Sequence, residues 1–185
     1  MTLRFEDLDA ALAAMLDRLP PALHIGAPLG LGKPHRLLNA LYARVAADPA
    51  RPMTLYTALS LDPPPAPPGL ARRFMGPFAE RQFGADFPRL AYVEALRRDA
   101  LPAHVSVEEF YLQSGAMLGS AQAQRRYASL NYTHVARALA DRGVNCIVQK
   151  VAANADATRL SLSSNTDLTF DAVDAIVAAG HPRPL

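Results

Sequence analysis

The stretch that decides the fold is "HIGAPLGLGKPHRLLNAL", which runs from His24 to Leu41. The short apolar segment 22–25 leads into it, three glycines follow, and apolar residues then recur at helical spacing. Proline is tolerated in the first turn of a helix, because its missing N–H has no intrahelical partner there. We therefore predict a strand over 22–25, a glycine-rich turn, and a helix that begins near Pro34.

The next apolar segment, "MTLYTALSL" at 53–61, is rich in residues that favour strands. A strand, a helix and a second strand thus follow one another within about forty residues, as in a right-handed parallel crossover. Such units build open sheets that are covered by helices. We predict a single α/β domain over 1–185, with an open, mostly parallel sheet flanked by helices.

The remaining elements are predicted from apolar spacing and from the positions of glycine and proline. Helices are expected over 5–19, 70–84 with a break near Gly76 and Pro77, within 87–102, and over 108–119, 131–143 and 167–180. Strands are expected over 104–107 and 144–152, a turn and returning strand over 154–164, and a stiff proline-rich spacer over 62–69. The expected helix caps are Asn131 or Thr133, and Asp167 or Thr169.

The composition argues against several classes of function. The net charge is +2 and the only lysines are Lys33 and Lys150, so nucleic acid is not expected as a partner. No apolar run approaches the roughly 18 residues of a membrane span, and the N-terminus lacks the features of a secretory signal. The single cysteine, Cys146, is expected to be buried, and without a disulfide framework we expect a cytoplasmic protein. The five histidines lack metal-ligand spacing, so no metal is expected.

The glycine turn fits neither of the common nucleotide-binding patterns. The spacing from Gly26 to Gly32 is one residue too long for a phosphate loop, and Pro34 replaces the hydroxyl residue. A dinucleotide fingerprint would need a third glycine where His35 stands. Backbone amides beside glycines, followed by a helix N-terminus, nevertheless suit an anion, a thioester oxygen or a pantetheine amide. A tight corner without a ligand is the alternative.

Two segments carry a resemblance to a known family. "IGAPLGLGKPHRLLNAL…MTLYTALSL" and the later "NYTHVARALADRGVNCIVQKVA…TRLSLSSNTDLTFDAV" resemble the acetyl-CoA hydrolase/transferase family, a branch of the CoA transferases. The resemblance covers about 22–61 and 127–177, and it rests on the order and spacing of the motifs. It implies a fold of the CoA-transferase (NagB/RpiA-like) type, in which this chain is the N-terminal half of a two-lobed enzyme.

The resemblance also implies a reaction. Members of the family transfer CoA between a thioester and a carboxylate, or hydrolyse the thioester, at a site between two similar halves. The nucleophile is a glutamate of the second half, which forms an acyl-glutamyl anhydride and then a glutamyl-CoA thioester. We therefore expect acyl-CoA and carboxylate substrates, coenzyme A as substrate with no resident cofactor, the C-terminal half as partner, and a possible homo-oligomer. This chain alone is expected to be catalytically silent.

Candidate substrate-binding residues follow from the glycine turn and from polar loops in the matching segments. They are Gly26, Gly30, Gly32, Lys33, Pro34, His134, Ser164 and Asn165. The alternatives are a solvent-facing helix start for His134, and turn or cap chemistry for Ser164 and Asn165. No catalytic residue is assigned, because all five glutamates are expected on solvated helix faces: Glu6, Glu80, Glu94, Glu108 and Glu109.

Two other functions remain open at this point. One is a free-standing α/β module that binds a phosphate or a nucleotide through the glycine turn. The other is an interaction domain of the same fold without chemistry. The acyl group, the acceptor and the choice between hydrolase and transferase are not predicted.

Overall fold

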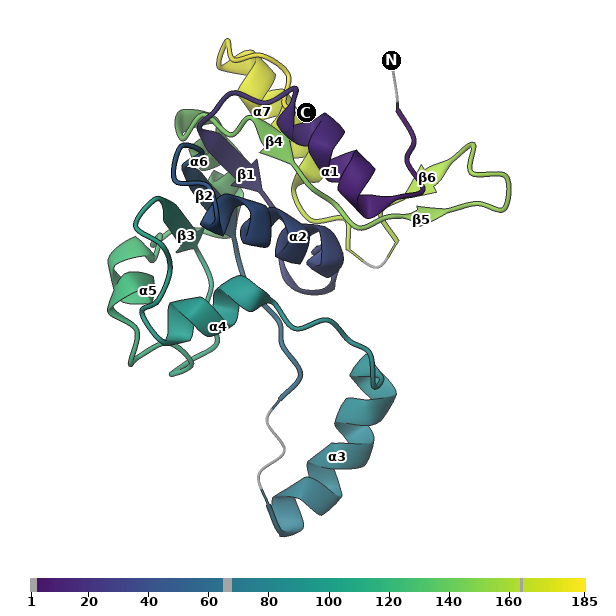
Figure 1. The fold of residues 1–185 in the computed structure, drawn as a ribbon, viewed down its shortest axis with the longest axis vertical. Coiled ribbons are helices and arrows are strands. Elements are labelled where there is room, and N and C mark those ends of the chain that lie inside the picture. Colours follow the sequence, from purple (N-terminus) through teal and green to yellow (C-terminus); the bar gives the residue numbers. More distant parts are fainter. Residues whose placement is uncertain (1–2, 65–67, 164) are drawn as a thin grey trace.

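The computed structural model describes residues 3–64, 68–163 and 165–185, and its centre is a parallel β-sheet (Figure 1). The strands are β1 (Leu23–Gly26), β2 (Met53–Thr57), β3 (Val105–Glu109) and β4 (Cys146–Ile147). All are parallel, in the order β3-β2-β1-β4. The predicted parallel α/β fold is thereby confirmed. Because β4 adds on the far side of β1 from β2, the direction of winding reverses between β1 and β4.

Helices cover both faces of the sheet (Figure 1). The first face carries α1 (Leu8–Leu16), α2 (His35–Ala46) and α4 (Ala91–Arg97), and the second carries α6 (Val135–Asp141) and α7 (Thr169–Ala178). The short helix α5 (Ala121–Arg126) contacts β3. Residues alternate along the strands, so Leu23, Ile25 and Leu55 join the first core while Tyr56 joins the second.

The two cores differ in size. The first contains buried leucine, isoleucine and valine side chains from three helices and three strands, and burial of each such side chain stabilises the fold by about 1.5–3 kcal/mol. The second core consists of Tyr56, Ala140, Val144 and Ile176, with a few half-buried neighbours. The second face is therefore the more thinly covered side of the sheet.

Helix α3 (Leu70–Phe83) extends away from the rest of the molecule (Figure 1). The break predicted near Gly76 and Pro77 is wrong, because the helix is continuous through both residues. The proline removes one backbone hydrogen bond, but water can serve the freed carbonyl on a helix that buries none of its residues.

The segment 108–119 is not the predicted helix. Its first two residues end β3, and the next helix begins only at Ala121. Ser120 caps that helix, because its Oγ accepts a hydrogen bond from the N–H of Ala123. The pairing of Val105–Glu109 with β2 outweighs the local helical pattern.

The last third keeps the predicted order of elements with shorter lengths. The 3₁₀ helix η2 (Tyr132–His134) precedes α6, and Asn131 caps it by accepting from the N–H of Thr133. The strand predicted over 144–152 shrinks to β4, and the predicted returning strand forms the hairpin β5 (Ala152–Ala153) and β6 (Leu160–Ser161). Leu185 adjoins the outer edge of β4, where it donates to Asn145 O and accepts from Ile147 N, both at 3.0 Å.

The predicted caps of α7 are not used. Leu168 precedes the helix without a side-chain cap, and Asp167 instead reaches back to the chain after β1. The first helix is also shorter than the predicted 5–19, because Asp7 caps it by accepting from the N–H of Ala10.

None of the helices within the described ranges has the length and apolar character needed to cross a membrane.

Candidate functional site

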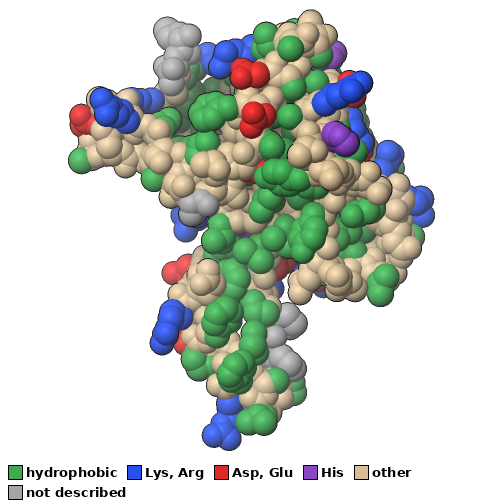
Figure 2. All heavy atoms as spheres, turned by 180° about the vertical axis from the view of Figure 1, so that it is seen from behind, with side chains coloured by type: hydrophobic (Ala, Val, Ile, Leu, Met, Phe, Trp, Pro, Cys, Tyr) green, Lys and Arg blue, Asp and Glu red, His purple; other side chains and the backbone are tan. Residues whose placement is uncertain are grey.

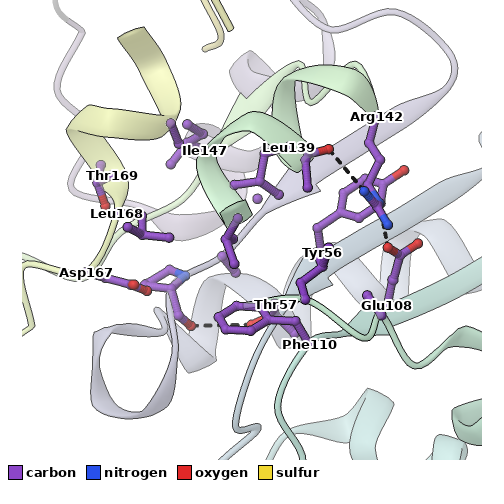
Figure 3. A pocket seen from close by; sticks show the side chains of 18 residues that line it. Tyr56, Thr57, Glu108, Phe110, Leu139, Arg142, Ile147, Asp167, Leu168 and Thr169 are labelled. Carbon is purple, nitrogen blue, oxygen red and sulfur yellow. Dashed lines mark hydrogen bonds and ion pairs between the residues drawn. The ribbon is translucent and has the colours of Figure 1, made fainter. Parts of the chain in front are cut away.

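The switch-point pocket lies where β1 and β4 run side by side in this doubly wound sheet. In open α/β sheets, ligands bind outside the carboxyl ends of the strands at the point where winding reverses. A pocket occupies that place, with a volume of about 570 Å³ when the open solvent at its mouth is included. It is walled by the ends of β1, β2, β3 and β4, by α6 and by the start of α7 (Figure 3).

The walls of the switch-point pocket are mostly apolar. Phe110 closes one side, and Leu139, Ile147 and Leu168 line others (Figure 3). Gly26 is one of the lining residues, and a Cβ there would come within 3.3 Å of Val144 Cγ1. The missing side chain therefore keeps β1 close to the chain that enters β4. A narrow apolar pocket with few polar groups suits a short acyl or alkyl group.

Two ionised side chains stand at one end of the switch-point pocket. Arg142 Nε lies 2.5 Å from Glu108 Oε1, and both side chains are partly buried (Figure 3). Tyr56 lies beside them and its Oη is 3.1 Å from His24 Nδ1. Burial, and then the neighbouring Glu108 carboxylate, raise the pKa of Tyr56, so the phenol stays protonated.

Asp167 stands at the opposite end and joins three segments. Its Oδ2 accepts a 2.8 Å hydrogen bond from Leu29 N, and its Oδ1 accepts one from Tyr132 Oη. The residue has φ of +37°, which is uncommon for a non-glycine residue. Desolvation, followed by the hydrogen bond to Asp167, raises the pKa of Tyr132. This carboxylate thus fixes the chain after β1 against the loop that enters α7.

The glycine turn forms the 3₁₀ helix η1 (Gly30–Gly32), and three of its amides donate hydrogen bonds within the protein. Gly30 N donates to Leu59 O at 3.1 Å, and Gly32 N to Leu29 O at 3.3 Å. Lys33 N donates to Gly30 O at 3.4 Å. These three bonds argue against the expectation that the amides face a ligand, which stays a prediction. The turn closes on the loop after β2 because that loop offers it carbonyl oxygens.

Asn165 packs directly on the turn, which explains one glycine. A Cβ at Gly32 would lie 2.6 Å from Asn165 Cγ, a distance that requires the amide to move. Asn165 Nδ2 donates to Leu29 O at 2.7 Å, whereas its Oδ1 is buried without a partner among the described residues. Of the predicted residues, Gly32 and Asn165 are thus brought together, but by packing on each other.

Lys33 is completely buried. Its Nζ donates to Ala58 O and, at 3.1 Å, to Leu59 O, so it holds the chain that leaves β2. Desolvation lowers the pKa of its amine, while the Glu109 and Asp167 carboxylates oppose that effect. The side chain predicted to face CoA therefore points inward. His35 is also buried, with Nδ1 3.0 Å from Lys33 O.

The glutamates divide into two groups. Glu6, Glu80 and Glu94 are exposed, as predicted. Glu108 and Glu109 are not on a helix; they end β3 and point to opposite faces of the sheet. Glu109 is only 2% exposed, which corrects the prediction of a solvated side chain.

Other predicted residues lie apart from the switch-point pocket. His134 is exposed at the end of η2, and Pro34 is half-buried just before α2. Ser164 lies outside the described residues. Cys146 is buried, and burial raises the pKa of its thiol to about 12, which makes it inert as a nucleophile.

Sequence reasoning missed Asp167, Glu108 and Arg142 as residues of the pocket. A signal exists for one of them, because an acid directly after "SSNT" and before a helix occupies a loop at the carboxyl edge of the sheet. The ion pair gives no such signal, since its partners are 34 positions apart. Within the described ranges, no group of three histidine, cysteine, aspartate or glutamate side chains is placed to hold a metal ion.

Comparisons with known proteins identify no similar protein. No family model matches the chain, and neither the curated proteins nor the solved structures give a match.

Proposed function

We propose that this chain is the substrate-binding N-terminal lobe of a CoA transferase or acyl-CoA hydrolase, and that the acyl group of a thioester enters the switch-point pocket. The observation that carries the proposal is the place of this narrow, mainly apolar pocket at the carboxyl ends of β1 and β4. The resemblance of 22–61 and 127–177 to the CoA-transferase family supports the same assignment. Coenzyme A is then a substrate and not a resident cofactor.

The polar ends of the pocket suit a thioester whose acyl chain lies between them. Arg142 and Tyr56 offer N–H and O–H donors on one side. On the other side, both carboxylate oxygens of Asp167 already accept hydrogen bonds from the protein. The glycine turn then has an indirect role. Through Lys33 it joins the loop after β1 to the loop after β2, and the loop after β1 contributes Ala27 and Pro28 to the pocket wall.

The catalytic carboxylate belongs, in this proposal, to a second lobe. Glu108 is the only glutamate among the described residues that lines the switch-point pocket, and it is paired with Arg142. A surface for a companion lobe is provided by α3, where Leu70 and Phe74 are each 79% exposed and Phe78 is 56% exposed. These side chains recur at four-residue spacing, and hydrophobic side chains run along this arm in Figure 2.

Calorimetry tests the proposal directly. We expect acetyl-CoA to bind more tightly than CoA without the acyl group, and we expect no binding of NAD or ATP. The variant Ala128→Phe inserts a phenyl ring at the pocket wall and should abolish the difference between acetyl-CoA and CoA. The matched control is Ala178→Phe, on the exposed last turn of α7.

Two outcomes would defeat the proposal. Affinity for NAD or ATP without affinity for acetyl-CoA would favour the nucleotide-binding alternative, which the internally bonded amides of the glycine turn already disfavour. Hydrolysis of acetyl-CoA by this chain alone, above the uncatalysed rate, would contradict the assignment of the nucleophile to another lobe.

The interaction domain is a second candidate, and the exposed apolar stripe of α3 favours it. It predicts that replacing Leu70, Phe74 and Phe78 by serine changes association with a companion lobe. It also predicts that acetyl-CoA does not bind, which separates it from the first proposal in the same calorimetric experiment.

A further inference from the structure

A second hollow opens at the same edge of the sheet, on the other side of the loops that leave β2 and β3. This Glu109 hollow lies between those loops and α3, and its volume is about 2190 Å³ when the open solvent in front of it is included. Phe78 and Phe83 of α3 form one wall, and Leu59, Ser60 and Leu112 belong to the loops. It shares no lining residue with the switch-point pocket.

A buried carboxylate with one unused oxygen lines the Glu109 hollow. Glu109 Oε1 accepts a hydrogen bond from Ser60 Oγ, which in turn lies 2.7 Å from the buried Tyr92 Oη. Glu109 Oε2 is buried and has no hydrogen-bond partner within the part of the chain that the structure describes. Buried polar atoms without a partner are rare in proteins and costly, so each one needs an explanation.

The surroundings of Glu109 restrict the charge of a ligand. Arg89 on the lining and the nearby Lys33 amine disfavour a cation, whereas Arg97 is paired with Asp62 at 3.5 Å. The Glu109 carboxylate itself disfavours an anion. A neutral group that donates a hydrogen bond avoids both penalties and satisfies the unused oxygen.

The protonation of Glu109 is consistent with an acceptor role in mildly alkaline solution. Burial raises its pKa, while the Ser60 hydrogen bond and the charge of Lys33 lower it. Burial lowers the pKa of the Lys33 amine to about 7, although its Nζ donates two hydrogen bonds to carbonyl oxygens. Because the carboxylate form of Glu109 is favoured as pH rises, the measurement is made at pH 8.

We propose that the Glu109 hollow binds a neutral small molecule with an apolar body, whose N–H or O–H donates a hydrogen bond to Glu109 Oε2. The phenyl rings of Phe78 and Phe83 and the side chains of Leu59 and Leu112 receive the apolar body. This inference does not rest on the binding of an acyl group, because the two hollows share no lining residue; only Phe78 belongs both to this hollow and to the exposed stripe of α3.

A pair of matched probes tests this proposal on the unmodified protein. Hexanamide carries an apolar chain and two N–H donors, and N,N-dimethylhexanamide keeps the chain without a donor. In nitrogen-15 NMR titrations at pH 8, we expect hexanamide to shift the amide signals of Ser60 and Glu109 and to bind about fivefold more tightly. That ratio corresponds to the net contribution of one hydrogen bond, about 1 kcal/mol.

A variant tests the role of the oxygen itself. Glu109→Gln keeps Oε1 as the acceptor from Ser60 and places an NH₂ donor where Oε2 stands, so the preference for hexanamide should vanish. The control Glu6→Gln, at an exposed glutamate, should leave the preference unchanged. Equal affinity of the two amides for the unmodified protein would overturn the proposal, as would the absence of shifts around the hollow up to the solubility limit of hexanamide.

Discussion

Glu108 and Glu109 are neighbours on β3, yet they have opposite surroundings. Glu108 faces α6 and forms a 2.5 Å ion pair with Arg142 at the switch-point pocket. Glu109 faces the larger core, where a serine hydroxyl serves one oxygen and the other has no partner among the described residues. Successive residues of a strand point to opposite faces of the sheet. Two neighbouring carboxylates therefore differ, because one has an ion-pair partner and the other has an oxygen without a partner.

The same contrast separates the two hollows. In the switch-point pocket, Glu108 and Asp167 both have partners supplied by the protein. In the Glu109 hollow, Ser60 donates a hydrogen bond to one oxygen of the carboxylate, while the other oxygen is buried without a partner among the described residues. We infer that the switch-point pocket selects its ligand by shape, and that the Glu109 hollow selects its ligand by one hydrogen bond.

The largest expected effect comes from removing the amine beneath Glu109. Lys33→Met should lower the free energy of unfolding by about 2–4 kcal/mol, because two carbonyls lose their donor and Glu109 loses the amine beside it. Urea unfolding followed by circular dichroism measures the change. The control is Lys150→Met at the other lysine, which is exposed and should change the value by less than about 0.5 kcal/mol. Equal losses in the two variants would contradict the structural role of Lys33.

The contact between the glycine turn and Asn165 gives the next effect. Gly32→Ala should cost about 1–3 kcal/mol, because its Cβ would displace the Asn165 amide from Leu29 O. Replacing Asn165 by alanine as well should recover part of that loss, since the obstructing amide is then gone. Strictly additive losses in the double variant, measured by the same urea method, would show that the two residues do not interact.

The pH dependence of stability tests the surroundings of Glu109. The folded-state pKa of Glu109 is raised above its unfolded value by burial, so the folded protein binds more protons in the interval between the two values. Its contribution is full below about pH 4.5 and is lost as pH rises through the folded pKa, by at most about 1.4 kcal/mol per pH unit.

The variant Glu109→Gln lacks this titration and therefore provides the comparison. We expect its stability relative to the unmodified protein to increase as pH rises above about 4.5. Thermal unfolding of both proteins at several pH values measures that difference. A difference that stays constant with pH would mean that Glu109 is not perturbed by its surroundings.

The smallest expected effect belongs to the ion pair. A double-mutant cycle with Glu108→Gln and Arg142→Met should give a coupling free energy of about 0.2–1 kcal/mol, because both side chains retain partial access to water. Added salt should weaken this coupling. A coupling above that range, insensitive to salt, would indicate a pair far more deeply buried than the structure shows.

The fold was largely predictable, because it depends on local patterns. The apolar segment 22–25, the glycines and the helical spacing after Pro34 define a parallel crossover without help from distant residues. The predictions failed where distant contacts decide. Pairing with β2 makes 105–109 a strand and ends the helix predicted over 108–119, and solvent around α3 permits Pro77 inside a helix.

The candidate site was less predictable, for physical reasons. A lysine after glycines suggests a ligand contact, but Lys33 is turned inward by two carbonyls of the chain that leaves β2, some 25 residues away. Two adjacent glutamates carry no local signal of which is buried, because that depends on strand register. Asp167 was expected as a helix cap, and its actual partner, Leu29 N, lies 138 positions away.

One measurement tests the central claim most directly: a nitrogen-15 NMR titration with acetyl-CoA, mapped residue by residue. The account predicts that the amide signals of Gly26, Phe110 and Leu168 shift with acetyl-CoA and shift less with CoA, because the acyl group fills the switch-point pocket. Shifts confined to the residues around Glu109, or identical shifts with the two ligands, would contradict it.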